Sequence, residues 1–135
     1  MAFQLSVAVR NARLDAIETA IGASAVLKIR TGAPPANCAA ADAGTVLATL
    51  ALPADWMAGA SAGEKALTGT WQDASADAAG TAAHFRLYAS DGTTCHAQGT
   101  VTATGGGGDM TVDNTNFAAG QSFSVSSFTL TEGNA

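Results

Sequence analysis

Short extended segments separated by turn-forming residues make up the sequence after residue 25, and this pattern constrains the fold most strongly. The segments contain Val, Thr and aromatic residues, whereas Gly, Pro, Ser and Asp separate them, as is typical of strands joined by tight turns. Several strands divided in this way predict an antiparallel β-sandwich or barrel. The expected strands lie at 25–30, 45–52, 65–72, 82–89, 94–104, 110–112 and 121–131.

Two details refine this expectation. Ser90-Asp91-Gly92 stands between two alternating runs and predicts a hairpin. The segment 121–131 carries apolar residues on both faces, so we expect it inside a sheet. The core must be thin, because alanine supplies half of the 47% hydrophobic share. Alanine loses almost no rotamer entropy on burial, so small residues opposite large ones can still form a core.

The residues before 25 allow two interpretations. Alternating apolar residues over 3–9 could mark a strand, but apolar residues also recur there with a helical period. We favour a helix over 5–21, because it contains good helix formers and Gly22 suits the left-handed position that ends a helix. Its narrow apolar face must pack against something, which could be another copy of the chain. We therefore predict an N-terminal helical arm at 1–24 and a β-sandwich domain at 25–135.

The distribution of charge bounds the partners. The formal net charge is −5, and a mildly basic start precedes an acidic remainder. An acidic body without Lys/Arg clusters lacks the surface that non-specific nucleic-acid binding requires, so we expect no nucleic acid as a partner. No stretch approaches the roughly 20 apolar residues of a membrane-spanning helix. The opening Met-Ala-Phe-Gln does not resemble a signal peptide. We expect a soluble, unsecreted protein with no membrane partner.

Thiol and imidazole chemistry is limited to Cys38, Cys95, His84 and His96. Cys95 and His96 are adjacent in an expected strand and point to opposite faces, so they cannot readily ligate one metal ion. A nucleophilic pair would need His84 to reach Cys95 across the hairpin, and no recognisable nucleophile context surrounds Cys95. We predict no metal, no cofactor and no enzymatic activity, with Cys95 as a small apolar filler. A disulfide between Cys38 and Cys95 stays open, since it would close a long loop but nothing indicates an oxidising compartment.

Two further patterns have structural interpretations. The pairs Asp73/Asp77 and Asp109/Asp113 lack calcium-loop spacing, so we expect these residues to form turns. The four glycines at 105–108 lack the Gly-Lys-[Ser/Thr] end of a phosphate-binding loop, and an aspartate follows them. They predict a flexible loop.

Contact with another protein is the remaining kind of site. Trp56 lies in a loop of small residues beside Met57, and it could be an exposed interface anchor or a lid on the core. Arg10 and Arg13 lie three residues apart on the arm and could orient it against an acidic partner surface. The full set of predicted contact residues is Phe3, Leu5, Arg10, Arg13, Trp56, Met57 and Phe117.

Four stretches carry a resemblance to known proteins. They are Arg10-Asn-Ala-Arg-Leu-Asp-Ala-Ile-Glu-Thr-Ala-Ile-Gly22, the segment from Lys28-Ile-Arg-Thr-Gly-Ala-Pro-Pro35 to Cys38, Leu67-Thr-Gly-Thr-Trp-Gln-Asp73, and Asn116-Phe-Ala-Ala-Gly-Gln-Ser-Phe-Ser-Val-Ser-Ser-Phe-Thr-Leu130. Together they look like a family of small virion proteins from tailed bacteriophages. Within that group the chain is most similar to the head decoration, or cement, proteins.

The resemblance implies a jelly-roll β-sandwich without catalytic residues that binds the outer surface of the virion head after synthesis in the host cytoplasm. The implied partners are the major capsid protein lattice and further copies of the chain, as a homodimer or homotrimer. The implied function is to stabilise the capsid by bridging capsomers. One alternative is a tail or fibre component that contacts a host receptor, which exposed aromatics in the loops 53–63 and 114–120 would favour. A small hydrolase or thiol enzyme acting on the cell envelope is a third hypothesis.

Overall fold

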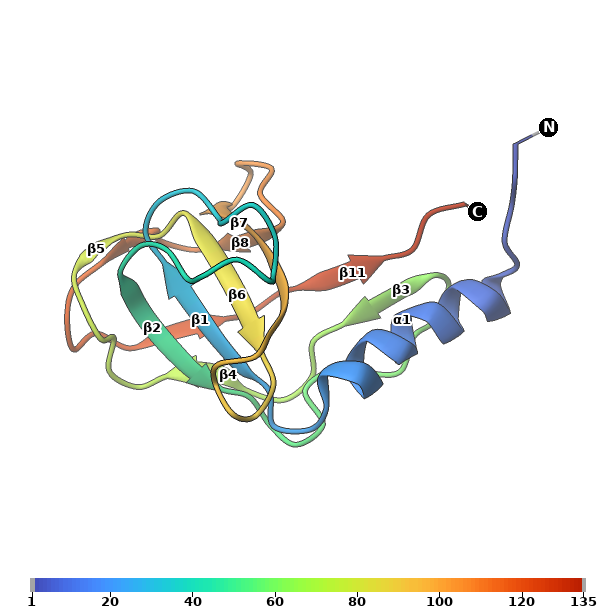
Figure 1. The fold of residues 1–135 in the computed structure, drawn as a ribbon, viewed down its shortest axis with the longest axis horizontal. Coiled ribbons are helices and arrows are strands. Elements are labelled where there is room, and N and C mark those ends of the chain that lie inside the picture. Colours follow the sequence, from blue (N-terminus) through green and yellow to red (C-terminus); the bar gives the residue numbers. More distant parts are fainter. Residues whose placement is uncertain (1, 135) are drawn as a thin grey trace.

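The computed structural model describes residues 2–134 and shows a mainly β protein with one N-terminal helix (Figure 1). This confirms the predicted fold class at that level. The helix α1 spans Val7–Ile21. The strands are β1 (Val26–Arg30), β2 (Val46–Ala51), β3 (Glu64–Ala66), β4 (Trp71–Asp73), β5 (Gly80–Thr81), β6 (His84–Tyr88), β7 (Cys95–Ala103), β8 (Met110–Val112), β9 (Asn116–Phe117), β10 (Phe123–Val125) and β11 (Thr129–Thr131).

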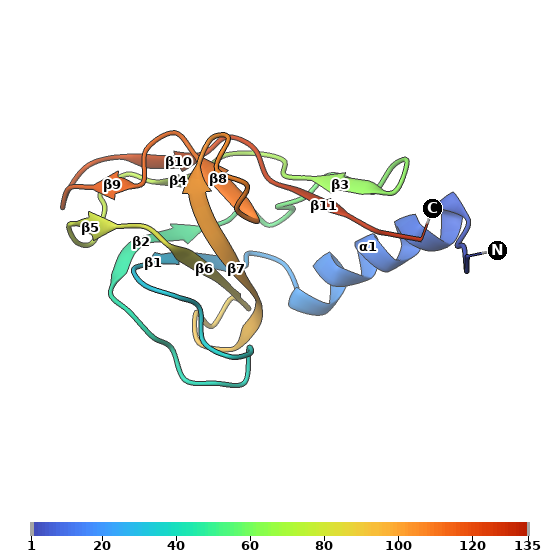
Figure 2. The ribbon, with the colours of Figure 1, turned by 90° about the horizontal axis from the view of Figure 1, so that it is seen from above.

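A curled five-stranded sheet with the order β2-β1-β6-β7-β8 forms the body of the molecule. In Figure 2, β1, β2 and β6 lie in one layer, β4, β8, β9 and β10 lie in the other, and β7 crosses between them. The pair β4–β10 belongs to the second layer, and β5 pairs with β9 at the far end. The pairing within the curled sheet is antiparallel except between β7 and β8. This order of strands does not by itself define a jelly roll.

The hairpin predicted at Ser90-Asp91-Gly92 is confirmed between β6 and β7. The Ala89 N–H donates to the Thr94 carbonyl at 3.0 Å and closes the turn. Asp91 accepts the backbone N–H groups of Thr93 and Thr94, each at 2.9 Å. Hydrogen bonds from Thr94, and then from Thr93, hold the pKa of the Asp91 carboxyl far below its usual value. The carboxylate therefore stays charged and keeps the turn closed over the ordinary pH range.

The glycines at 105–108 are folded against β7 and allow an unusual parallel pairing. β8 returns beside the end of β7, with Val101 opposite Met110. Parallel neighbours usually require a crossover of a dozen residues or more. The short return is possible here because Gly106 has no side chain. A Cβ atom at this position would lie only 2.7 Å from the Thr102 Cβ. The Gly108 N–H also donates to the Thr102 hydroxyl at 3.0 Å. Close approach of the backbone therefore requires the glycines.

Two of the expected strands are each divided. The segment 65–72 becomes β3 and β4, interrupted at Gly69, whose φ of 70° leaves the extended region. The segment 121–131 becomes β10 and β11, which residues 126–128 separate. β4 then pairs with β10 in the body, whereas β3 pairs with β11 in a ribbon that leaves it (Figure 1). The expectation that 121–131 lies inside a sheet is wrong, because each of its strands pairs with a single neighbour.

The core lies between the two layers. Its centre is a row of aromatic rings in which Trp71 contacts Trp56 and Phe128 at centroid distances of 6.0 and 5.8 Å, and Phe85 contacts Phe128 at 5.7 Å. All five residues of β6 are buried. One face of β6 points into this core, and the other lies beneath residues 31–45, which connect β1 and β2 and which we call the strap.

Candidate functional site

The arm extends away from the curled sheet along the ribbon formed by β3 and β11 (Figures 1 and 2). Its helix begins after Ser6, whose hydroxyl accepts the Val9 N–H at 3.2 Å. It ends at Gly22, where φ is 92° and the N–H donates to the Glu18 carbonyl. The helix predicted over 5–21 is therefore confirmed for all but its first two residues. The segment before the helix is also bound to the segment after β11, since the Leu5 N–H donates to the Asn134 carbonyl at 2.7 Å.

A polar face of α1 holds the arm against the loop before β3. Asn11, Asp15 and Glu18 lie on one side of the helix, because their spacing matches the helical period. The Asn11 side chain accepts the Gly63 N–H at 2.9 Å, and Asp15 accepts the Ala60 N–H at 2.9 Å. Leu14 and Ile21 supply the buried apolar contacts of the helix.

Lys65 of β3 reinforces this contact from a buried position. Its side chain is 2% exposed, and its Nζ lies 2.7 Å from Asp15 Oδ1 and 3.0 Å from Glu18 Oε1. The Ala58 carbonyl accepts a third hydrogen bond at 2.9 Å. Burial alone would lower the pKa of Lys65, but the hydrogen bonds to Asp15 and Glu18 outweigh it and raise that pKa above 10.5. The lysine is therefore charged and fully paired, and it ties the helix to the ribbon.

The opposite side of the helix is apolar and open. Val9, Ala12, Ala16 and Ala20, which belong to the apolar stripe of the sequence, are all exposed. Large apolar side chains are exposed only on the arm among residues 2–134; they are Phe3 at 75%, Val7 at 48%, Val9 at 45% and Ile17 at 36%. The exposed stripe of Val9, Ala12, Ala16 and Ala20 therefore has no covering partner within the described part of the chain, whereas Leu14 and Ile21 of the same helix are buried.

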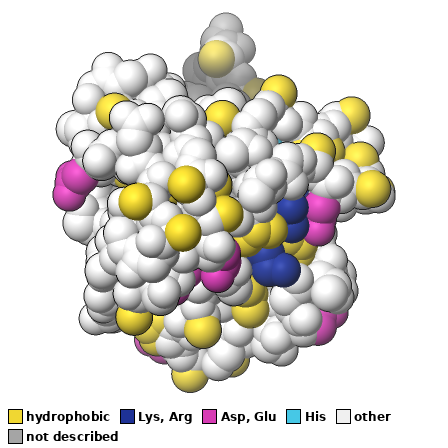
Figure 3. Space-filling view, turned by 90° about the vertical axis from the view of Figure 1, so that its left-hand side faces the viewer, with side chains coloured by type: hydrophobic (Ala, Val, Ile, Leu, Met, Phe, Trp, Pro, Cys, Tyr) yellow, Lys and Arg dark blue, Asp and Glu magenta, His cyan; other side chains and the backbone are white. Residues whose placement is uncertain are grey.

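The end of the molecule opposite the arm has a different surface. Figure 3 shows scattered apolar patches there, and Lys or Arg side chains in a single hollow beside acidic ones. Because the large exposed apolar side chains lie on the arm, the apolar atoms at this end belong to small or partly buried residues. The concentrated apolar surface is thus at the arm.

The structure brings four predicted contact residues together on the arm. Phe3 is exposed and Leu5 is partly buried. The Arg13 guanidinium is half exposed and pairs with Glu132 of the C-terminal segment at 3.1 Å. The Arg10 side chain lies over the turn at Gly63, where a Cβ atom would collide with its guanidinium. Arg10 and Arg13 are therefore used within the chain, whereas Phe3 is free to meet a partner.

The other three predicted contact residues are not on the surface. Trp56 is 0% exposed and Met57 is 1% exposed, which decides between interface anchor and core lid in favour of the core. The Trp56 indole N–H donates to the Gly22 carbonyl at 2.9 Å, so this residue closes the junction between arm and body. Phe117 is also buried, with its ring 4.6 Å from that of Phe123. As exposed contact residues these three predictions are wrong, because aromatic packing recruits them into a core poor in bulky side chains.

A groove lies between the arm and the strands β6 and β7 of the curled sheet. It has a volume of about 450 Å³, and both α1 and β11 contribute to it. Ile17 of the arm faces it, together with His96 of β7 and Leu130 of β11. The groove extends the open apolar surface of the arm toward the body.

His84 and Cys95, the two members of the conceivable nucleophilic pair, are far apart along the hairpin. His84 pairs with Thr100 in the ladder, whereas Cys95 pairs with Tyr88 at the other end of the hairpin. Four residues along a strand separate the two positions by about 13 Å. His84 is buried, and its Nδ1 lies 2.6 Å from the Gly32 carbonyl. Cys95 and His96 line different cavities, as expected for neighbours on opposite faces.

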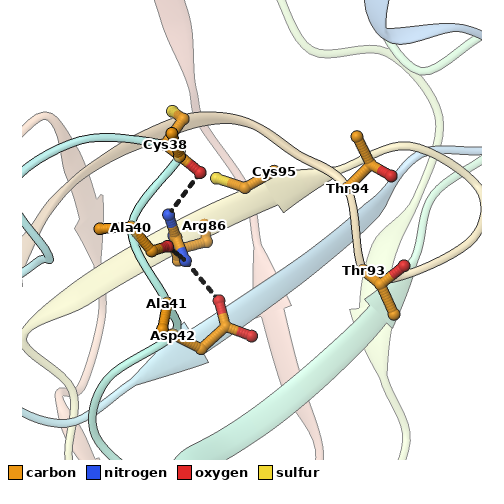
Figure 4. A pocket seen from close by; sticks show the side chains of 9 residues that line it. Cys38, Ala40, Ala41, Asp42, Arg86, Thr93, Thr94 and Cys95 are labelled. Carbon is orange, nitrogen blue, oxygen red and sulfur yellow. Dashed lines mark hydrogen bonds and ion pairs between the residues drawn. The ribbon is translucent and has the colours of Figure 1, made fainter.

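The strap is fixed to the outer face of the sheet by a buried charge network (Figure 4). Arg86 of β6 is 2% exposed and bonds to the carboxylate of Asp42 in the strap. Arg30 and the Tyr88 hydroxyl bond to the same carboxylate at 3.0 and 2.7 Å. Arg86 Nη1 also donates to the Ala40 carbonyl, and Nη2 donates to the carbonyls of Asn37 and Cys38 in the strap.

The pKa of Asp42 follows from these contacts. Burial raises it, but hydrogen bonds from Tyr88 and Arg86, together with the charges of Arg30 and Arg86, outweigh burial and hold it below 3.8. Burial and the bond to Asp42 raise the pKa of the Tyr88 hydroxyl above 10.0. The network is therefore charged and intact at neutral pH.

Two further aspartates, Asp73 and Asp109, accept hydrogen bonds from the backbone of other segments. Asp73 accepts the Thr49 and Ser75 N–H groups at 2.9 and 3.0 Å. Asp109 binds the N–H and hydroxyl of Thr100 at the glycine turn. In residues 2–134, no group of three or more His, Cys, Asp and Glu side chains could hold a metal ion. The described helix is not long and apolar enough to cross a membrane.

Comparisons of the chain with protein-family models, with curated proteins and with solved structures found no match. The proposal of a function below rests on the geometry of the arm and on the sequence resemblance.

Proposed function

We propose that the protein is a structural component of a bacteriophage virion that decorates the capsid exterior and stabilises it by bridging capsomers. One observation carries the proposal: the large exposed apolar side chains of residues 2–134 all lie on the arm, which ion pairs with the buried Lys65 hold in place. Concentrated apolar surface of this kind marks a protein interaction site. The sequence resemblance supplies the partner, which is the major capsid protein lattice.

The mechanism needs only surface burial. An interface of standard size buries about 800 Å² on each partner. A subunit that binds the assembled shell but not its separated parts stabilises the shell by mass action. We further propose that the chain acts as a homodimer or homotrimer, because several linked arms can bind neighbouring capsomers at once.

The resemblance also implies a jelly-roll sandwich. The two layers joined by β7 support a fold of this general type (Figure 2). The parallel pairing of β7 with β8 departs from it. We propose the jelly roll as the parent architecture, with the glycine turn as a local modification.

A tail or fibre component that contacts a host receptor is the alternative that the sequence allows. Exposed aromatics in the loops 53–63 and 114–120 would favour it. The aromatic residues of these loops, Trp56 and Phe117, are both buried. No specific observation therefore favours the alternative over decoration of the head.

Co-sedimentation tests the proposal. Empty heads of the phage that encodes the chain, prepared without it, are mixed with the full chain and pelleted. We expect the wild-type chain to pellet with the heads and the double variant Val9→Ser/Ile17→Ser to bind at least about tenfold more weakly. Ala118→Ser, an exposed substitution outside the arm, is the matched control and should bind normally. A wild-type chain that stays in the supernatant, or a double variant that binds equally well, would contradict the proposal.

A further inference from the structure

We propose that Cys38 and Cys95 form a site of reversible oxidation, at which a disulfide joins the strap to the start of β7. Both cysteines are free thiols in the structure, and both are partly exposed. They line the same cavity, which has a volume of about 610 Å³. Figure 4 shows the Cys95 side chain pointing from β7 toward Cys38 in the strap. This inference does not rest on the proposed virion function.

The backbone around Cys38 is already held near Cys95. Arg86 donates to the Cys38 carbonyl at 3.0 Å and to the Asn37 carbonyl at 3.1 Å. Arg86 belongs to β6, and β6 pairs with β7 directly at Tyr88 and Cys95. Arg86 therefore holds the part of the strap that carries Cys38 over the hairpin that carries Cys95, and the two thiols lie on neighbouring segments that line one cavity. Since a disulfide tolerates only a narrow range of geometry, such prior positioning decides whether two thiols can pair.

The surroundings of the two thiols set the order of the chemistry. Burial, followed by the hydrogen bond with Cys38, raises the pKa of Cys95 to about 11. Cys95 is therefore protonated near neutral pH, which makes it a poor attacking group for the first step. The positive charge of Arg86 acts in the opposite direction and favours the Cys95 thiolate when that thiol loses its proton.

The oxidant is a small disulfide such as oxidised glutathione. The Cys38 thiolate attacks one sulfur atom of the oxidant, which forms a mixed disulfide and releases one glutathione thiolate. Cys95 then gives its proton to solvent, and its sulfur attacks Cys38 and displaces the second glutathione. Two protein thiols are oxidised to one disulfide, and one glutathione disulfide is reduced to two glutathione molecules.

The disulfide would hold the strap by a bond that acid cannot break. In the reduced protein the strap depends on the charged network of Arg86 and Asp42, which weakens when Asp42 is protonated. After oxidation, the covalent link would keep the strap on the sheet even when that network is lost.

Oxidation of the full chain tests the inference. The protein is incubated with oxidised glutathione, the remaining thiols are alkylated, and intact mass and a peptide map under non-reducing conditions are recorded. We expect both thiols to disappear together, with the loss of two hydrogen atoms and a peptide pair linked through Cys38 and Cys95. Stable glutathione adducts on the wild-type chain, or disulfides between chains as the main product, would overturn the proposal.

Single variants separate the pairing from general reactivity. Cys38→Ser and Cys95→Ser each retain one thiol, so we expect glutathione adducts on them and no internal disulfide. Cleavage by elastase within the alanine-rich part of the strap should be about tenfold slower for oxidised than for reduced wild type, and unaffected by oxidant in Cys38→Ser. Equal cleavage of oxidised and reduced wild type would show that the bond does not fix the strap.

Discussion

Buried positive charges distinguish this chain at the level of single residues. Lys65 and Arg86 are each 2% exposed at the side chain, and both are paired with carboxylates that remain partly exposed. Taking a cation out of water is unfavourable unless partners replace its hydration. Each of these residues therefore fixes one segment: Lys65 holds the arm to the ribbon, and Arg86 holds the strap to the sheet.

Replacing Lys65 tests the first of these roles. Lys65→Met removes three hydrogen bonds and leaves the loop carbonyl of Ala58 without its donor. We expect a loss of about 2 kcal/mol in the free energy of unfolding, because the freed carboxylates can still turn toward water. Arg13→Ala breaks only a half-exposed pair with Glu132 and should change stability by less than about 0.5 kcal/mol. Urea unfolding monitored by circular dichroism measures both variants, and equal effects would refute the distinction.

The pH dependence of stability tests the second role, in which Arg86 holds the strap to the sheet through Asp42. The folded protein holds the pKa of Asp42 below 3.8, so this residue contributes stability that is present above pH 3.8 and is lost as the pH falls through the lowered value. We expect Asp42→Asn to be less stable at neutral pH and to lose less stability on acidification than the wild type. Tyr88→Phe, which removes one donor to Asp42, should give a smaller change in the same direction. Unfolding midpoints in urea across the acidic range give the answer, and an unchanged acid slope in Asp42→Asn would contradict it.

The burial of Trp56 shows what the sequence could and could not reveal about single residues. Its loop of small residues allowed either an exposed anchor or a core lid. The decision depends on Trp71 and on the carbonyl of Gly22, which the fold brings next to it from distant parts of the chain. Such contacts leave no periodic signal. The exposed Val7 and Ile17 were also not among the predicted contacts, because a polar helix face normally meets water, whereas here Asn11, Asp15 and Glu18 bind backbone N–H groups of the loop before β3.

The glycine turn illustrates how an element depends on the absence of a side chain. Gly106→Ala places a methyl group 2.7 Å from the Thr102 Cβ and 3.0 Å from the Ala103 carbonyl oxygen. We expect it to destabilise the protein by about 2 kcal/mol, as overpacking does, and to loosen β8. Gly59→Ala meets no atom within 4 Å and should lie within about 0.5 kcal/mol of the wild type. Thermal unfolding and hydrogen exchange of β8 amides measure the effect, and a neutral Gly106→Ala would show that the turn is not packed.

Most elements could be placed from the sequence because turn chemistry is local. The hairpin at Asp91 and the helix end at Gly22 depend on residues within a few positions, and both predictions hold. The divided segment 121–131 could not be foreseen in the same way. At Ser126 and Ser127 the chain leaves one partner strand for another, so Phe123, Val125 and Phe128 all become buried despite their spacing. Alternation alone cannot report where a strand changes partner.

At the scale of the whole molecule, the body and the arm differ in how they treat apolar side chains. The body buries nearly all bulky apolar residues between its two layers, whereas the arm leaves its apolar stripe open. The sequence reveals that the helix has such a stripe, but not which face the ribbon covers. That choice is made by Lys65 and by the loop before β3, which bind the polar face and turn the apolar face outward.

Localisation of the chain on intact particles tests the central claim most directly. Cryo-electron microscopy of the virion that encodes it, compared with particles lacking the gene, should show extra density on the outer surface of the head between capsomers. The account predicts that the curled sheet fits this density with the arm directed toward the shell. Density confined to the tail, or no difference between the two particles, would contradict it.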